Sequence, residues 1–375
     1  MTDVRLLKNG AEAFPAMFKA INCATSSIVL EMYYIADDRT GREFRLQLIR
    51  AAKRGIRVLV LVDAWGSMNL SDEFWNELRV WGGVVRWFHP LLKGLLPFRN
   101  HRKLLLIDDQ VAYIGGINIA DKYFYGIDSE LPWRDNVIEI SGNDVVRLRR
   151  SFVRMWIKAD SPYRRLFYSL TSKHRVKAIT GDIVRFLESG PENRMRPVRQ
   201  AYLQLVQNAM KNIDLAMGYF YPHGRMLLAL KRAVKRGVRV RLLLPEKTDV
   251  PVTRWAARGL YGRLLRAGIE VWEYEPTMLH TKLAIADGTV VAGSANLDIR
   301  SGRINHELVA IVSDAAIATK ARADFEDDLK LSHRIDLLDW KKRPLIQKVK
   351  ERISYFLLAR ADVFIARFAM HRKIK

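Results

Sequence analysis

The feature that most constrains this chain is a polar motif that occurs twice with the same internal spacing. Residues 101–108 read HRKLLLID, and residues 280–287, which begin 179 positions later, read HTKLAIAD. A glycine-containing turn that ends in asparagine follows each copy, GGIN at 115–118 and GSAN at 293–296. Core packing constrains apolar positions and leaves polar identities free, so the shared polar residues indicate a duplicated site with one chemistry.

The segments around the motif repeat in the same order. Residues 28–34 and 213–219 both have the composition of buried strands, and AKRGIRV at 52–58 returns as VKRGVRV at 234–240. A helix followed by a fully apolar strand favours a βαβ unit and therefore a parallel sheet covered on both faces. We predict an α/β fold of two tandem halves about a pseudo-twofold axis. The expected units are a first half, a second half and a basic amphipathic helical tail: residues 1–178, 179–338 and 339–375.

The composition fits a globular protein that binds anions. The chain has 375 residues, 49% of them apolar, which is enough for sizeable cores. A net charge of +23 and a pI near 10.2 favour polyanions, of which nucleic acid and an anionic membrane are the ordinary candidates. The single cysteine, Cys23, excludes a disulfide within the chain and is consistent with a reducing cytosol.

No segment predicts export or membrane spanning. Residues 1–19 lack the continuous apolar stretch of a signal peptide, and no window approaches the roughly 18 apolar residues of a spanning helix. If the protein acts on a membrane, we expect it to act from the surface.

The repeated residues have side chains that can transfer a phosphoryl group. Residues two apart on a strand share a face, so His101 lies beside Lys103 and His280 beside Lys282. Packed about a pseudo-twofold axis, the two pairs can face one cleft. One imidazole can attack phosphorus while the other protonates the leaving alkoxide, and the lysines stabilise the developing charge. Because the lysines supply positive charge and repel cations, we expect no metal ion and no other cofactor.

Other polar residues of the repeat are expected to support the histidines. Asp108 and Asp287 complete the catalytic motifs, but each ends its strand and is expected to brace the site rather than to react. The expected phosphate-binding residues belong to the glycine-containing turns: Asn118, Ser294 and Asn296.

A nucleophilic imidazole needs an acceptor at its second ring nitrogen. An acid precedes an apolar strand at the matching place after each motif, Asp135 in WRDNVI and Glu307 in NHELV. We expect these acids to orient the histidines, with Asp135 holding the ring of His101. The alternative is that both are surface carboxylates that open a strand.

The loop before the first motif breaks the repeat. Ten residues separate Pro90 from His101, whereas three separate Pro276 from His280. The longer loop is apolar and basic, and it is expected to contact lipid or, alternatively, to fold back on its own domain. The expected membrane contacts in this loop are Leu91, Leu92, Leu95, Leu96 and Phe98.

The C-terminal tail differs from the rest of the chain in its pattern of basic and apolar residues. A basic cluster at 341–343 precedes a helical stripe of apolar residues that includes Phe356 and Leu357. Its charges suit a helix that lies on anionic lipid better than one that spans a membrane. The alternative is a terminal helix pair docked on the catalytic domain. On the first interpretation, deleting residues 341–375 releases the protein from anionic vesicles, and unchanged sedimentation with vesicles contradicts it.

Taken together, these motifs resemble the phospholipase D superfamily. The doubled HxK(x)4D motif followed by GGxN and GSxN is highly specific for that superfamily, and the resemblance covers nearly the whole chain. The segments around Glu31, Asp63 and Asp298 further resemble bacterial cardiolipin synthases. Because no N-terminal spanning helix is visible in the sequence, the resemblance implies the shorter, peripheral type of synthase. Glu31 has no acidic counterpart in the second half, where Ala216 stands.

The resemblance implies two α/β/α halves around one active site and a phosphatidyl transfer. A covalent phosphatidyl-histidine forms, the glycerol hydroxyl of a second phosphatidylglycerol attacks it, and free glycerol leaves. By analogy, His101 is the nucleophile and His280 the acid and then the base. Phosphatidylethanolamine is an alternative donor. The implied partner is an anionic phospholipid membrane, at the cytoplasmic face of a bacterial inner membrane. No oligomer is required, since the duplication supplies both half-sites.

Two other functions would use the same residues. Water in place of the alcohol would make the site a phospholipase D-type hydrolase or a nuclease, and the basic charge fits a nuclease equally well. A DNA-cutting enzyme does not need the apolar loop and tail, so no nucleic-acid partner is expected. A catalytically silent lipid-binding module is disfavoured because both motifs are intact.

Overall fold

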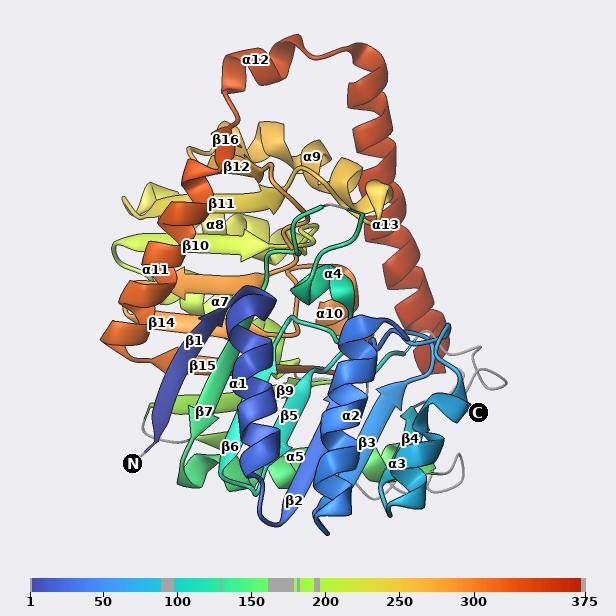
Figure 1. Ribbon diagram of the computed structural model, residues 1–375. Helices are drawn as coiled ribbons and strands as arrows, with labels where there is room; N and C mark the ends of the chain where they lie inside the picture. The colour runs from blue at the N-terminus through green and yellow to red at the C-terminus, as the bar shows by residue number, and fades with distance from the viewer. Residues whose placement is uncertain are drawn as a thin grey trace.

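Two β-sheets packed against each other form the centre of the molecule, and helices cover their outer faces (Figure 1). The computed structural model describes residues 2–88, 98–128, 130–160, 179–180, 183–191 and 196–371.

The first sheet is built from the N-terminal part of the chain. Within the described residues its seven strands lie in the order β1-β7-β6-β5-β2-β3-β4. The strands are β1 (Asp3–Lys8), β2 (Ser27–Met32), β3 (Arg57–Asp63), β4 (Val84–Phe88), β5 (Leu104–Ile107), β6 (Val111–Gly115) and β7 (Asn136–Ser141). The helices are α1 (Asn9–Cys23), α2 (Arg39–Lys53), η1 (Asp72–Trp75), α3 (Asn76–Val80), α4 (Asp121–Phe124), η3 (Asn143–Val145) and α5 (Val146–Asp160).

The second sheet is built from the rest of the chain. Its nine strands in the described residues lie in the order β16-β12-β11-β10-β13-β14-β15-β9-β8. The strands are β8 (Ile179–Thr180), β9 (Val184–Ser189), β10 (Asn212–Met217), β11 (Arg239–Pro245), β12 (Glu270–Tyr274), β13 (Lys282–Ala286), β14 (Thr289–Gly293), β15 (Glu307–Ser313) and β16 (Ser332–Arg334). The helices are α7 (Pro197–Asn208), α8 (Gly224–Lys235), α9 (Pro251–Leu265), α10 (Ile299–Arg303), α11 (Ala315–Lys330), α12 (Leu337–Lys342) and α13 (Leu345–His371).

The repeated Lys-Arg-Gly sequence ends equivalent helices in the two halves. Helix α2 ends at Lys53 and α8 at Lys235, and the glycine two residues later has a φ of 83° at Gly55 and 87° at Gly237. Glycine adopts this left-handed conformation without steric cost, which lets the chain turn from the helix into the next buried strand.

Both sheets are mixed, so the expectation of a parallel sheet is only partly correct. In the first sheet β2, β3 and β4 run parallel, as do β10, β11 and β12 in the second. The strand that carries each motif, β5 or β13, instead lies antiparallel beside β2 or β10. The short turns that join β5 to β6 and β13 to β14 permit only antiparallel pairing, because a parallel neighbour needs a long crossover.

The two halves share the core between the sheets. Helices α1 and α2 cover the outer face of the first sheet, and α7, α8 and α9 cover that of the second. Between the sheets, side chains from both halves form one buried cluster with α5 and α11. Its members include Leu104, Ile138 and Phe152 from the first half and Leu283, Leu308 and Phe325 from the second. The inner core therefore fixes the relative position of the halves.

Helix α13 packs against α9 and runs along one side of the molecule (Figure 1). Glu351 is buried and accepts hydrogen bonds from Arg258 and Arg343, at 3.3 and 3.0 Å. Gly259 on α9 lies so close that an added Cβ would come within 2.8 Å of the Glu351 carbonyl oxygen. The start of the tail is therefore docked on the protein, as one of the two interpretations expected. Among the described residues, no helix has the length and apolarity needed to cross a bilayer.

Candidate active site

Both motif histidines line one cavity of about 530 Å³ between the two halves. Asn118 and Asn296 line the same cavity, and Leu358 of α13 contributes to its wall. Aromatic side chains form much of the remaining wall: Tyr33, Tyr34, Trp65, Tyr123, Trp133, Tyr219 and Tyr221. The structure thus brings residues that are 179 positions apart into one site, with apolar rings around the polar centre.

Each histidine is paired with the acid of the opposite half. Nδ1 of His280 lies 2.7 Å from Oδ2 of Asp135, and Nδ1 of His101 lies 3.1 Å from both carboxylate oxygens of Glu307. The expectation that Asp135 holds His101 is therefore wrong. The reason is that β7, which follows Asp135, and β15, which begins at Glu307, face the opposite half across the inner core.

Backbone hydrogen bonds across the halves set this crossed arrangement. The amide of Arg134 donates to the Met278 carbonyl, and the amide of His280 donates to the Arg134 carbonyl, at 2.9 and 2.8 Å. The other half repeats the pattern, since His306 donates to the Arg99 carbonyl at 2.8 Å and His101 donates to that of His306 at 3.0 Å. The backbone of Arg134, which precedes Asp135, therefore holds the segment before His280, and the backbone of His306, which precedes Glu307, holds the segment before His101.

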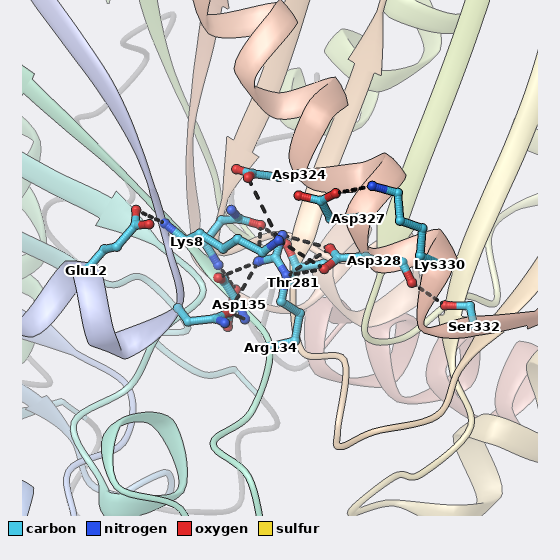
Figure 2. Close-up of polar contacts among 12 residues, drawn as sticks. Lys8, Glu12, Arg134, Asp135, Thr281, Asp324, Asp327, Asp328, Lys330 and Ser332 are labelled. Carbon is cyan, nitrogen blue, oxygen red and sulfur yellow. Dashed lines mark hydrogen bonds and ion pairs between the residues drawn. The ribbon is translucent and has the colours of Figure 1, made fainter.

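Arg134 also joins the halves through its side chain, a role that the sequence did not reveal. Its guanidinium is buried, forms an ion pair of 2.8 Å with Asp328 on α11, and donates to the Asp135 carbonyl and to Oδ1 of Asn136 (Figure 2). Thr281, next to His280, donates to the same Asn136 oxygen at 2.7 Å. The strand of Asp135 and the segment of His280 are thereby held together on both sides.

The motif lysines lie behind the histidines and are almost fully buried. Nζ of Lys103 donates to the His101 carbonyl at 2.8 Å, and Nζ of Lys282 donates to that of His280. Burial lowers the pKa of Lys103 from 10.5 to about 7 and that of Lys282 to about 8, although the Glu307 and Asp135 carboxylates oppose the shift. Near pH 7 to 8 the two lysines therefore lose their protons readily, and a bound anion would stabilise their charged forms.

The histidines and their acids also have shifted pKa values. Burial lowers the pKa of both His101 and His280, and the neighbouring lysine charges add to that effect. Burial raises the pKa of Asp135 to about 6, while Lys282 and the Asn136 amide act against it. The imidazoles are therefore neutral at pH 7, the state in which a ring nitrogen can act as a nucleophile or base.

Asp108 and Asp287 lie at the far ends of the motif strands from the histidines. Asp108 accepts hydrogen bonds from the amides of residues 25–27, and Asp287 accepts them from residues 210–212. These contacts lower the pKa of Asp108 to about 2 against the opposing effect of burial. Both aspartates brace the start of a neighbouring strand, so their place in the catalytic set is not supported by the geometry.

The three expected phosphate-binding residues have different positions. Oδ1 of Asn118 and of Asn296 is buried and has no hydrogen-bond partner among the described residues, so each can accept a hydrogen bond from a ligand hydroxyl group but not from a phosphate oxygen. Ser294 instead donates to Glu307 and accepts from the Leu308 amide at 3.0 Å. Ser294 therefore contacts the acid of His101 and is not among the residues that line the cavity, so the geometry does not support its assignment to phosphate binding.

Glu31, whose counterpart in the second half is Ala216, has a local structural role. It is buried, pairs with Arg102 at 3.1 Å and accepts from Nδ2 of Asn100 at 2.9 Å. It thus holds both neighbours of His101. The second half needs no such acid, because Thr281 stands in place of Arg102 and bonds across the halves instead.

The expected membrane contacts are only partly within the described residues. Leu91, Leu92, Leu95 and Leu96 lie outside them. Phe98 is 2% exposed, so it is packed inside the protein and is not a surface contact. Phe356 and Leu357 are more than half exposed on α13.

Two tandem sheet halves with an HxK motif from each at a single cavity define a phospholipase D-like protein. The family model described as "Cardiolipin synthase, PLD-like domain" matches residues 17–156 and 202–329. The chain therefore belongs to the cardiolipin synthase family of phospholipase D-like proteins.

Curated relatives and a solved structure are similar over most of the chain. The cardiolipin synthase of Geobacillus sp. (strain WCH70) is 33% identical over 95% of this chain and 72% of its own length. The major cardiolipin synthase ClsA of Bacillus subtilis (strain 168) is 32% identical over 95% of this chain and 74% of its own. The crystal structure of phosphatidylserine synthase from Haemophilus influenzae Rd KW20 covers 97% of this chain and 94% of its own, with a TM-score of 0.73 and 13% identity. This last similarity concerns the fold.

Proposed function

We propose that the protein transfers a phosphatidyl group from one phosphatidylglycerol to another, producing cardiolipin and glycerol. The observation that carries this proposal is the crossed pair of dyads, in which each neutral histidine is held by a carboxylate at one cavity. Two buried lysines lie behind the same histidines and can stabilise a phosphodiester. The relatives named cardiolipin synthase support cardiolipin as the product.

The first step forms a covalent intermediate. The Nε2 lone pair of one histidine attacks the donor phosphorus, the bond from phosphorus to the glycerol oxygen breaks, and the second histidine supplies the proton that glycerol takes away. Because both imidazoles are neutral in the free site, the second one must gain its proton as the anionic substrate binds. By analogy we assign His101 as the nucleophile and His280 as the acid.

The second step uses the same groups in reverse. The glycerol hydroxyl of a second phosphatidylglycerol gives its proton to His280, its oxygen bonds to phosphorus, and the bond between phosphorus and nitrogen breaks. Cardiolipin leaves with His101 restored. Asn118 and Asn296 line the cavity from opposite halves, and in this proposal their Oδ1 atoms accept a hydrogen bond from the glycerol hydroxyl groups.

We further propose that the protein works at the surface of an anionic membrane, on the cytoplasmic side. The apolar residues of α13 that face away from α9 form an exposed stripe, and each is more than half exposed. The stripe consists of Leu345, Ile346, Val349, Ile353, Phe356 and Leu357. Lys348 and Arg352 lie beside it, an arrangement that suits anionic lipid headgroups.

The test is to incubate the pure protein with phosphatidylglycerol vesicles and to separate the lipid products. We expect cardiolipin and an equal amount of glycerol. Phosphatidic acid alone would show that water is the acceptor and would assign a hydrolase. No lipid turnover, with plasmid DNA degraded in parallel, would assign a nuclease.

A further inference from the structure

Two arginines from opposite halves line the catalytic cavity. Arg99 precedes His101 by two residues, and Arg300 lies in α10, four residues after Asn296. The guanidinium of Arg99 stacks over the Trp65 ring at 4.6 Å and donates to the Phe98 carbonyl at 3.1 Å. Stacking and hydrogen bonding together fix its plane at the cavity wall.

The duplication shows that this arrangement is particular to one side of the cavity. The counterpart of Arg99 is Met278, and the counterpart of Arg300 is Lys122, by the same offsets that relate the two histidines and the two asparagines. Lys122 also lines the cavity, but its ammonium is held over aromatic rings. It lies 4.1 Å from the ring centroid of Trp133 and 4.5 Å from that of Tyr34.

The two sides of the cavity therefore differ in charge. One side has two arginines, whereas the other has a single lysine whose charge is stabilised by aromatic faces, because Met278 does not line the cavity. A shared site built from a duplicated chain needs no such difference for a symmetric reaction. A transfer in which one lipid is the donor and another is the acceptor gives the two sides different roles, and a difference in charge suits those roles.

The positive charges of Arg99 and Arg300 repel each other at the cavity wall. Arg99 is only 9% exposed, and burial lowers its pKa, with the charge of Arg300 lowering it further. The nearby Asp63 carboxylate opposes this shift, but it also accepts hydrogen bonds from the amides of Trp65, Gly66 and Asn100. An anion in the cavity would offset the repulsion between the arginines.

The proposed reaction supplies two phosphates to this cavity, and the motif lysines account for only one. The transferred phosphate must lie at the histidines, where Lys103 and Lys282 are placed. The acceptor phosphatidylglycerol brings a second phosphodiester, one three-carbon glycerol away from its attacking hydroxyl. Guanidinium groups suit it because their planar fork can bind two phosphate oxygens at once.

We propose that Arg99 and Arg300 form a binding site for the phosphate of the acceptor phospholipid, separate from the site of the transferred phosphate. This inference rests on the proposed transferase function. It explains how the site selects a phospholipid acceptor over water or a small neutral alcohol.

The test compares two acceptors in one reaction. In mixed micelles of phosphatidylglycerol with radiolabelled glycerol, the enzyme forms cardiolipin with a charged acceptor and labelled phosphatidylglycerol with a neutral one. We expect Arg300→Gln to lower the ratio of cardiolipin to labelled phosphatidylglycerol at least about tenfold, because charge-assisted hydrogen bonds to the acceptor are lost. Arg300→Lys, which keeps a charge without the fork, should give an intermediate ratio.

Arg303→Gln is the matched control, since Arg303 lies on the same helix and contacts His223 at 3.1 Å, away from the cavity lining. Its ratio should equal that of the unaltered protein. An unchanged ratio in Arg300→Gln, with both products reduced equally, would overturn the acceptor site and assign the arginine to the donor. Labelled phosphatidylglycerol without cardiolipin from the unaltered protein would instead overturn the proposed transferase and the acceptor site with it.

Discussion

At the residue scale, the chemistry depends on which nitrogen of each imidazole carries the proton. The contacts of His280 with Asp135 and of His101 with Glu307 both involve Nδ1. A proton on Nδ1 satisfies the carboxylate, so the Nε2 atom retains its lone pair. The acids therefore act as positioning residues, and their effect passes through the histidines.

The pairing of each acid with the histidine of the opposite half predicts which acid variant still forms a phosphoenzyme. If each acid instead held the histidine of its own half, the prediction would be reversed. Asp135→Asn and Glu307→Gln should each lower kcat by on the order of 10²- to 10⁴-fold, because the amides favour the wrong tautomer. With an activated donor whose leaving group needs no acid, Asp135→Asn should still form a phosphoenzyme, as should His280→Asn.

Glu307→Gln should lose the phosphoenzyme burst, as should His101→Asn. Rapid-quench detection of labelled enzyme provides the measurement. A burst in Glu307→Gln that is absent in Asp135→Asn would mean that the nucleophile is His280.

The motif lysines predict a limit to activity at alkaline pH. With pKa values of about 7 and 8, Lys103 and Lys282 lose their charge in the free enzyme as the pH rises through this range. Bound phosphate favours the charged forms and raises both pKa values. We therefore expect kcat/KM to fall above about pH 7 to 8, and kcat to fall only at a higher pH. If kcat and kcat/KM fell at the same alkaline pH, this explanation would be contradicted.

The same lysines should affect stability in the opposite direction. Between their lowered pKa values and the ordinary 10.5, the unfolded chain binds more protons than the folded one. Their contribution to the free energy of unfolding therefore rises with pH from about 7 to 10.5. Urea unfolding of Lys103→Met should show a weaker rise over this window than the unaltered protein.

At the scale of elements, α13 has two faces with different partners. Its buried Glu351 ties it to α9, whereas its apolar stripe faces outward. Deleting residues 341–375 would remove both contacts at once, so loss of stability could accompany loss of membrane binding. Substitutions confined to the stripe separate the two effects.

We predict that Ile353→Asp combined with Leu357→Asp reduces sedimentation with phosphatidylglycerol vesicles at least about tenfold, because two apolar anchors become anions. The melting temperature should change little, since both side chains are more than half exposed. Val80→Asp, at an even more exposed apolar residue on α3, is the control and should sediment normally. Unchanged sedimentation of the double variant would exclude the stripe as a membrane contact.

The sequence was sufficient to predict the repeated elements but not their long-range partners. Apolar periodicity and the two HxK motifs are local signals, and they indicated the strands and the shared cavity. The pairing of Asp135 with His280 spans 145 positions and depends on how the sheets face each other. Ser294 has the residue type of a phosphate ligand, and only its contact with Glu307 reveals its role. Phe98 has the residue type of a lipid contact, and only its burial excludes that.

At the scale of the whole molecule, Arg134 connects the halves within the shared core. Arg134→Ala would leave Asp328 buried without its guanidinium partner and remove contacts to the Asp135 strand (Figure 2). We expect the free energy of unfolding to fall by about 3–5 kcal/mol, in a single transition reported by both halves. Urea titration followed by fluorescence measures it. The exposed pair of Arg5 and Glu139 is the matched control, and Arg5→Ala should cost less than about 1 kcal/mol.

The pairing of each histidine with an acid of the opposite half also affects how the two repeats can evolve. Neither half encodes a complete pair of histidine and acid, so a gene for one half alone could produce a working dyad only if two copies of its product associated. Within the fused chain, a change near Asp135 alters selection on the sequence around His280, and a change near Glu307 does so around His101. The two repeats can therefore drift apart in their outer helices while their inner edges are obliged to evolve together.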